Sequence, residues 1–432
     1  MSKGLSIDDP SWIDDASPLV DRLDLLHRTL RPGAGHRSFE LYHRAACSLR
    51  IGLRDGECIT VRRGVDDGLA LRSLSSDGRE IAFAATSGSG KQSLQWVLAR
   101  SRQSRGRAFP ETAWARDGDR LKADHEAVLR LPSVDELTAW LVQARDELVG
   151  STVGPRAGPE PLELWVEAAA TAESWVADGG LKALRTRARG WGMLRLRKPA
   201  GAGSSTRPVL IARRNWADLP IGGWKAVLED RRLSGSRVAG PPAQRVPILF
   251  SPECSAILVM ALVKALHSGE SEPRFPVGPA WNVVDDPGHA TALFGGGFDD
   301  AGFATRRTLL ADGLRATGSV GGEGHFRRPS FRDRPVPMPS HLVVQTAGSV
   351  PPSRAVLATA LSLHPLDRDQ WMLEIDGAYL EAGRPGPILR SAIVAVSPTE
   401  LVRRCVAAVG PARLSHLGVK TPALVFDGLT LR

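Results

Sequence analysis

Apolar and polar residues alternate along the N-terminal part of the chain in the manner of β-strands with one buried face. Two hairpins are predicted, each joined by a short turn that contains Asp-Gly: residues 44–53 with 58–63, and residues 68–74 with 80–85. Residues 89–101 then change to helical spacing. This order predicts a sheet with helices on one side.

Helical patterns recur further along the chain. Ser133 followed by Glu136 has the form of a capping box and predicts the start of a helix. Residues 246–251 are apolar enough for a buried strand, and residues 252–267 then carry apolar side chains at helical spacing. Beyond them, many short segments are interrupted by Gly and Pro, which is typical of a mostly β domain.

We therefore expect the α+β class, with an α/β N-terminal part, a mixed sheet and flanking helices, followed by a mostly β C-terminal domain. A Gly- and Pro-containing linker at residues 235–244 separates the two parts. The expected segments are an N-terminal domain at 1–130, a basic middle segment at 131–240 and a C-terminal domain at 246–432.

Composition limits the possible classes of protein. The chain has 432 residues, of which 42% are hydrophobic and 24% charged, as in an ordinary globular protein. Residues 1–10 are polar and no apolar signal segment follows, and Lys264 interrupts the longest apolar run. The four cysteines form no C-x-x-C motif, so neither a disulfide framework nor a four-cysteine zinc site is expected. These observations predict a cytoplasmic protein without a membrane segment.

Positive charge is concentrated in one segment. The net charge is +9, and residues 181–245 hold 15 Lys or Arg against 3 Asp or Glu. Arg185, Arg187 and Arg189 recur at spacing two, which places them on one face of a strand. That face has three interpretations: a docking site for an acidic peptide or partner, a phosphate-backbone site with Trp191, Trp216 and Trp224 for stacking, or a solvated surface.

The sequence lacks complete motifs for nucleotide binding and for hydrolysis through a covalent intermediate. Ser87–Ser93 resembles a phosphate loop, but Gln92 follows Lys91 where a hydroxyl residue should bind magnesium. No G-x-S-x-G sequence occurs, so a metal-independent hydrolase lacks a visible nucleophile.

Four C-terminal segments follow one another in this order: Asp285-Asp286-Pro287, Phe298-Asp299-Asp300-Ala301-Gly302, Phe326-Arg327-Arg328-Pro329-Ser330 and Gly377-Ala378-Tyr379-Leu380-Glu381-Ala382-Gly383. In sequence and in order they resemble motifs of the TldD/PmbA family, in which zinc metalloprotease subunits pair with metal-free subunits. Ala301 replaces an acidic residue of the family motif.

The metal ligands of that family are missing. Where its zinc subunit has H-E-x-x-x-H, this chain reads Pro252-Glu253-Cys254-Ser255-Ala256-Ile257. The third ligand of the family is a cysteine, and residues 345–350 contain none. Proline and isoleucine cannot bind zinc. The resemblance thus implies a metal-free chain without catalytic residues, with zinc in the partner. Glu253 is then either a helix-terminal residue or a remnant base without a metal-bound water.

The resemblance implies a noncatalytic subunit, inactive alone, of a heterodimeric TldD/TldE-like zinc metalloprotease. Its partners would be a TldD-like zinc-binding subunit and an unfolded peptide, such as the leader peptide of a modified natural product. The candidate contacts are Glu253, His325, Arg327, Arg328, Arg185, Arg187 and Arg189. His325 is either such a contact or part of a solvated loop. The alternative function is a basic nucleic-acid-binding or regulatory protein that acts through residues 181–245, although we expect no nucleic-acid partner.

Overall fold

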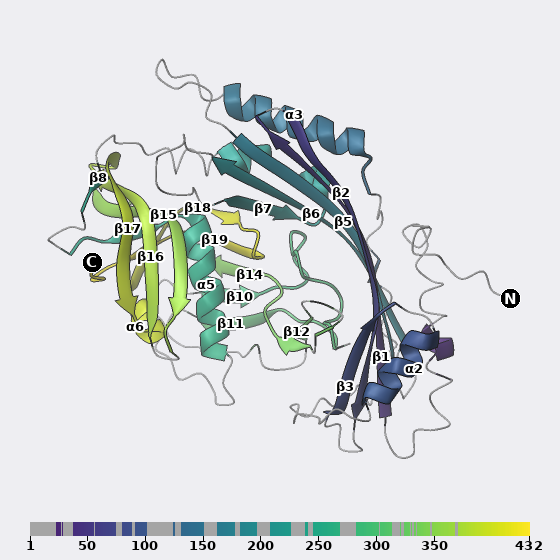
Figure 1. Cartoon of the computed structure of the whole chain (residues 1–432). Helices are drawn as coiled ribbons and strands as arrows, with labels where there is room; N and C mark the ends of the chain where they lie inside the picture. The colour runs from purple at the N-terminus through teal and green to yellow at the C-terminus, as the bar shows by residue number, and fades with distance from the viewer. Residues whose placement is uncertain are drawn as a thin grey trace.

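A computed structural model provides the fold. It describes residues 23–26, 28, 38–55, 57–74, 80–88, 91–101, 124–125, 131–150, 162–177, 182–196, 208–225, 238–240, 245–267, 282–301, 303–312, 320, 324–328, 330, 332–333, 335–345, 348–367 and 370–432. The described part is α+β with far more strand than helix, and it forms two large sheets (Figure 1). The predicted fold class is confirmed.

The first sheet is built from long strands of the N-terminal half. In the described residues its order is β3-β2-β1-β5-β6-β4, with β7 paired to β6. The bounds are β1 (Ser38–Arg54), β2 (Glu57–Leu74), β3 (Glu80–Ser87), β4 (Asp124–His125), β5 (Leu162–Ala177), β6 (Lys182–Leu196) and β7 (Val209–Arg213). Both predicted hairpins are present. The sheet joins strands on both sides of position 130, because β5, β6 and β7 of the basic middle segment share it with the N-terminal strands. Residues 238–239 of that segment instead pair in the C-terminal sheet.

Two helices cover one face of this sheet. Helix α2 (Lys91–Ser101) packs Leu94 against Leu41 of β1, and α3 (Val134–Gly150) packs Leu141 against Ile51. The capping box of α3 forms as predicted, because Ser133 N donates to Glu136 at 2.7 Å and Glu136 N donates to Ser133 Oγ at 3.1 Å. Strand residues alternate between faces, so the residues between these apolar positions point to the opposite side.

The second sheet belongs to the C-terminal half. Its order in the described residues is β11-β10-β14-β19-β9-β15-β16-β17-β8, with β18 paired to β19. Its strands are β8 (Val238–Ala239), β9 (Ile248–Phe250), β10 (Asn282–Asp285), β11 (Thr308–Asp312), β14 (Leu342–Gln345), β15 (Arg354–Pro365), β16 (Trp371–Glu381), β17 (Arg384–Val396), β18 (Cys405–Leu414) and β19 (Val419–Phe426). A separate short pair joins β12 (Phe326–Arg327) to β13 (Val336–Pro337).

Helix α5 (Pro252–His267) supplies the centre of the C-terminal core. It begins directly after β9, and its bounds match the range predicted from apolar spacing. Leu258 and Leu262 are buried against strand residues that include Val356 of β15. The short helix α6 (Pro398–Arg404) packs beside it, and its N-cap Ser397 Oγ accepts from Glu400 N at 3.0 Å.

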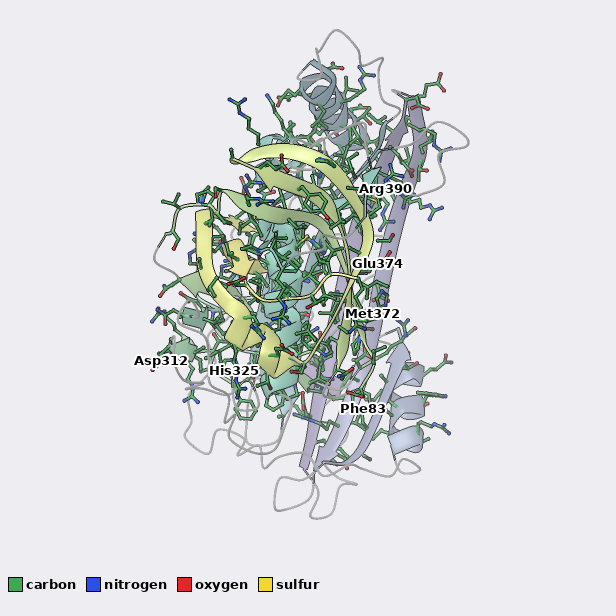
Figure 2. All side chains as sticks on the ribbon, turned by 90° about the vertical axis from the view of Figure 1, so that its left-hand side faces the viewer. Phe83, Asp312, His325, Met372, Glu374 and Arg390 are labelled. Carbon is green, nitrogen blue, oxygen red and sulfur yellow. The ribbon has the colours of Figure 1, made fainter. Side chains whose placement is uncertain are left out.

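The two halves lie side by side. Figure 2 turns the molecule so that the curved strands carrying Met372, Glu374 and Arg390 face the viewer, with the long strands of the first sheet behind them. The uncovered face of the first sheet therefore meets the loops of the C-terminal half. No helix of the described residues is long and apolar enough to cross a membrane.

Candidate functional site

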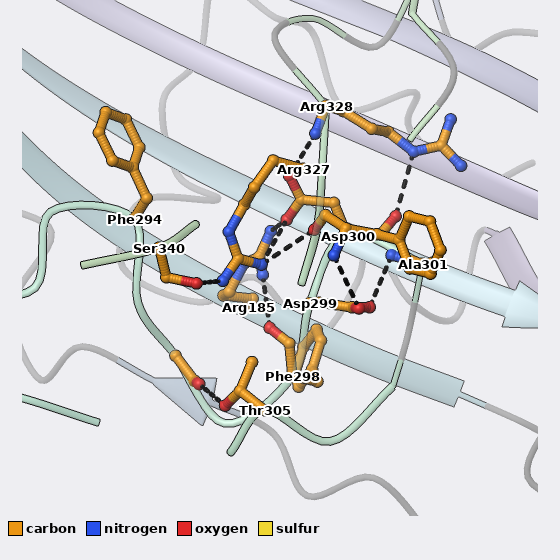
Figure 3. Close-up of polar contacts among 12 residues, drawn as sticks. Arg185, Phe294, Phe298, Asp299, Asp300, Ala301, Thr305, Arg327, Arg328 and Ser340 are labelled. Carbon is orange, nitrogen blue, oxygen red and sulfur yellow. Dashed lines mark hydrogen bonds and ion pairs between the residues drawn. The ribbon is translucent and has the colours of Figure 1, made fainter. Parts of the chain in front are cut away.

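A buried arginine on β6 joins the two halves. Arg185 Nε and Nη2 both donate to Glu173 Oε2 on the neighbouring β5, at 2.7 and 2.5 Å. From the C-terminal half, Asp300 Oδ1 accepts from Nη2 at 2.5 Å, and the carbonyl oxygen of Phe298 accepts from Nη1 at 2.9 Å (Figure 3). The rings of Trp175 and Phe298 lie 4.8 and 5.2 Å from the guanidinium carbon. Arg185 is 0% exposed, so this is a desolvated ion-pair cluster.

Arg185 keeps both carboxylates charged. Burial by itself would raise the pKa of Glu173, but Arg185 and then Arg187 outweigh it and lower that pKa to about 2. The pKa of Asp300 is lowered for the same reason, with Arg185 as the strongest opposing charge. Tyr42 OH donates to Glu173 Oε1 at 2.9 Å, which satisfies the other carboxylate oxygen.

The two adjacent aspartates of the Phe298–Ala301 motif bond to different kinds of partner. Among the described residues, Asp299 accepts hydrogen bonds from four backbone N–H groups: Ala301 and Phe303 donate to Oδ1, each at 2.9 Å, while Gly324 and Phe326 donate to Oδ2 at 2.9 and 3.0 Å. Asp299 therefore fixes the shape of the loop. Asp300 faces the first sheet and pairs with Arg185, as Figure 3 shows.

Beside this cluster lies a cavity of about 130 Å³ between the two halves. Five arginines and two carboxylates line it, together with Thr171, Phe294, Met338 and Pro339; the charged residues are Arg44, Arg187, Arg189, Arg327, Arg328, Glu173 and Asp300. None of the lining residues comes from α5. The cavity is thus an arginine-rich compartment separate from the helix at which the family resemblance would place a metal.

Arg187 and Arg189 are both held in the wall of this cavity. Arg187 Nη2 donates to the carbonyl oxygen of Gly295 at 2.7 Å, and the Arg189 guanidinium lies over the ring of Phe294, 4.8 Å from its centre. Any side chain at Gly295 would meet the carbonyl oxygen of Pro287, since its Cβ would lie 2.0 Å away. Glycine there permits the close loop that presents its carbonyl to Arg187.

Arg327 and Arg328 come from the opposite wall. Arg328 Nη2 donates to Glu40 at 3.0 Å and its backbone N donates to Asp300 Oδ2 at 2.6 Å. Arg327 donates to Ser340 Oγ and to the carbonyl oxygen of Phe326. The structure therefore brings together five of the seven predicted contact residues: Arg185, Arg187, Arg189, Arg327 and Arg328.

The predicted character of the β6 face needs correction. The strand and the common face are present, but Arg185 and Arg187 are only 0% and 5% exposed. They do not form a solvated surface or an open docking face, because the C-terminal half covers them. Stacking on a tryptophan platform also fails for Trp224, which is 0% exposed in the core under α3. For the phosphate-backbone interpretation, Arg185, Arg187 and Trp224 are therefore not accessible, whereas Arg189, Trp191 and Trp216 are partly exposed.

His325 also differs from its prediction. It is 1% exposed, with Nδ1 bonded to Asp285 Oδ2 at 2.9 Å and Nε2 to Thr308 Oγ1 at 3.1 Å. Asp285 additionally accepts from the backbone of Ser340 and His341. His325 is therefore neither in a solvated loop nor at a peptide-contacting surface. It helps to hold the loop after β10.

Sequence reasoning missed three charged lining residues, Arg44, Glu173 and Asp300, and the four uncharged ones. Glu173 lies directly opposite Arg185 in the β5–β6 register and opposite Arg44 in the β1–β5 register. Once the pairing of β5 with β6 was known, an acidic residue opposite a strand arginine would have indicated this ion pair. For Asp300, the aspartate pair after Phe298 was noticed only as a family motif.

Comparisons with known proteins give no match by sequence: no protein-family model matches the chain, and no curated protein does. Solved structures do match. TldE from Thermococcus kodakarensis superimposes with a TM-score of 0.75 at 14% identity, covering 95% of this chain and 99% of that one. A protein described as a modulator of DNA gyrase from Thermotoga maritima gives 0.71 at 15%, covering 95% and 99%. A third, with the same description, from Bacteroides thetaiotaomicron gives 0.70 at 16%, covering 95% and 98%.

The chain has the TldE fold. This confirms the resemblance to the TldD/PmbA family at the level of structure, across nearly the whole chain.

Within this TldE fold, the start of α5 does not fit a zinc ion. Pro252 is buried, and Ile257 packs against the C-terminal core. Ser255 Oγ donates to the carbonyl oxygen of Phe250 and accepts from Leu424 N, each at 3.0 Å. Glu253 lies in the first turn of the helix, as predicted. Among the described residues, no group of three or more His, Cys, Asp or Glu could hold a metal ion.

Proposed function

We propose that this chain is the metal-free, noncatalytic subunit of a two-subunit peptidase of the TldD/PmbA family. The observation that carries the proposal is the TldE fold over 95% of the chain, combined with Pro252 and Ile257 at the two positions where the resembling zinc subunit has histidines. A side chain without a lone pair cannot bind zinc. The partner subunit would supply the metal and its bound water.

The start of α5 supports a structural role for this chain. The side chains around Glu253 pack against strands or bond to them, so the helix is anchored on its inner side. Glu253 is in the first turn, where a negative charge interacts favourably with the helix dipole. This role requires no reacting group on the chain.

The peptide would bind in extended form. Strand β11 lies at one end of the second sheet in the described residues, and a strand at an edge can pair with an added peptide strand. Pairing through backbone atoms accepts unfolded peptides of varied sequence, such as leader peptides. The four cysteines are free thiols, which suits the reducing cytoplasm where we expect the complex to act.

The decisive experiment is reconstitution with a paralogue that carries the H-E-x-x-x-H motif. Co-expression should give a stable complex of one copy of each chain on size exclusion with light scattering. Cleavage of an unfolded peptide should occur in the mixture and be absent with either chain alone. Full activity of the paralogue alone, at matched concentration and zinc content, would refute the proposal.

A further inference from the structure

The arginine-lined cavity holds more positive charge than its own carboxylates can balance. Five guanidinium groups face two carboxylates among its lining residues. Both carboxylates already bond to Arg185, which lies behind the wall and is not itself a lining residue. Of the lining arginines, Arg328 is paired with Glu40 outside the cavity lining, whereas Arg187 and Arg189 have no carboxylate partner within salt-bridge distance in the described part of the chain.

Two of these arginines bond mainly to neutral groups. Arg187 donates to the carbonyl oxygens of Gly295 and Phe294 at 2.7 and 3.4 Å. Arg189 lies on the ring of Phe294, and its buried Nε has no hydrogen-bond acceptor within the described part of the chain. The buried Nε of Arg327 has none there either. Each wall of the cavity thus holds a lining arginine with a buried donor that the described residues leave unsatisfied.

The environment disfavours the charge on Arg187 and Arg189. Burial lowers the pKa of Arg187 well below its ordinary value, and Arg185 lowers it further. Burial also lowers the pKa of Arg189 to about 10, against the opposing effect of Glu173. Arginine still remains charged near pH 7, so these shifts express a free-energy cost of desolvated positive charge. A bound anion would remove that cost.

The cavity has the size and shape for such an anion. Its volume of about 130 Å³ is several times the ~30 Å³ that one water occupies in the liquid. Arg187 and Arg189 approach from β6, and Arg327 approaches from the opposite wall at β12. Five lining residues are only partly buried, so solvent reaches part of the lining: Arg44, Thr171, Arg189, Phe294 and Met338. Planar guanidinium forks match carboxylate and phosphate oxygens.

We propose that this cavity binds one small oxyanion, a carboxylate or a phosphate, between Arg187 and Arg189 on β6 and Arg327 on β12. The anion would tie the first sheet to the loops of the C-terminal half. The site lies within this chain alone, so it does not depend on the proposed partner or peptidase activity. Its failure would leave the proposed function untouched.

The first experiment measures binding of inorganic phosphate to the purified full chain by isothermal titration calorimetry, with chloride keeping the ionic strength constant. The native chain should bind about one phosphate. Arg189→Gln should weaken binding at least about tenfold, because it removes a lining guanidinium with few protein partners. Arg195→Gln is the matched control: Arg195 is on the same strand, is exposed and lies outside the cavity. It should bind like the native chain.

Two results would overturn the proposal. In the first, the native chain binds neither phosphate, up to tens of millimolar, nor the carboxylate probes described in the next paragraph. In the second, the native chain and Arg189→Gln bind phosphate equally well. Should Arg189→Gln fail to fold, crystals of the native chain soaked in selenate replace it. The anomalous selenium peak should then lie within hydrogen-bond distance of Arg187 and Arg189. A selenium peak elsewhere also overturns the proposal, and so does the absence of a peak when the carboxylate probes do not bind either.

Further titrations separate the two possible sources of the anion. A tripeptide with a free C-terminal carboxylate is compared with the same peptide as its C-terminal amide, and both are compared with phosphate. The ligand is a carboxylate if the free-acid peptide binds more tightly than phosphate and if this binding disappears both with the amide peptide and in Arg189→Gln. Tighter binding of phosphate identifies a phosphate ligand. Equal binding of the acid and the amide, with no phosphate binding, contradicts an oxyanion site.

Discussion

At the scale of single residues, Arg185 forms the most deeply buried of several contacts between the two halves. It bonds to Glu173 within the first sheet and to Asp300 from the other half, with no exposure to solvent. Its charge compensates both carboxylates in a setting where water cannot. Loss of this side chain would remove the strongest compensating charge from Glu173 and Asp300, which are both buried, and should therefore lower the stability of the fold.

Replacing Arg185 with Met should lower the free energy of unfolding by about 3–5 kcal/mol, the usual cost of removing one partner from a buried ion pair. Arg195→Met is the control, because that exposed side chain pairs with Glu163 at 3.5 Å and such pairs contribute up to about 1 kcal/mol. Urea denaturation followed by circular dichroism measures both. A loss below about 1 kcal/mol for Arg185→Met would contradict the cluster.

The same cluster predicts a loss of stability in acid. The pKa of Glu173 is about 2 in the folded chain and near 4.5 when unperturbed. A lowered folded pKa gives stability that is complete above the unfolded value and is lost as the pH falls toward the folded value. Unfolding free energies at pH 6, 4.5 and 3 should therefore fall across the window from about 4.5 to 2. Arg185→Met should flatten that fall; an unchanged slope would show that Glu173 is not held by Arg185.

Glu253 provides the residue-level test of chemistry. In the reconstituted complex, Glu253→Gln should change kcat/KM by less than about tenfold, roughly 1.4 kcal/mol of barrier. The reason is that the proposed zinc-bearing partner would supply its own glutamate for proton transfer. Glu253 lies in a first helical turn, and the described part of the chain offers no cluster of metal ligands. Steady-state kinetics on the assembled complex check this. A thousandfold loss with assembly intact would assign Glu253 a catalytic role.

At the scale of secondary structure, packing of the β6 strand against the short helix Trp216–Asp218 depends on a glycine. A Cβ at Gly190 would lie 2.3 Å from Trp216 Cα, which is backbone and cannot rotate away. Gly190→Ala should therefore destabilise the chain by about 1–3 kcal/mol. Gly222→Ala, where nothing lies within 4 Å, should be neutral or stabilise by up to about 1 kcal/mol. Thermal unfolding compares them, and equal effects would contradict this packing.

Individual helices and strands were largely predictable from local sequence. The bounds of α5 followed from proline at its start and apolar spacing along its length, and the capping box of α3 followed from Ser133 and Glu136. Spacing-two arginines correctly indicated one face of a strand. Local sequence did not show that this face is covered, because Asp300 lies 115 residues from Arg185.

At the scale of the whole molecule, long-range pairing decides which residues form the candidate site. His325 is buried through a bond to Asp285, 40 residues away, and Arg328 reaches Glu40 across 288 residues. No spacing rule within one segment predicts such partners. The family motifs did locate the loops that approach the first sheet, but only as a resemblance; the cavity and its excess of arginines required the assembled fold.

The most direct test of a metal-free subunit is the zinc content of each chain, measured by mass spectrometry of metals after dialysis without chelator. The chain alone should hold no stoichiometric zinc. Its complex with the H-E-x-x-x-H paralogue should hold about one zinc per pair, and the same amount should remain after Glu253→Gln. About one tightly bound zinc per copy of this chain, purified without the paralogue, would contradict the account.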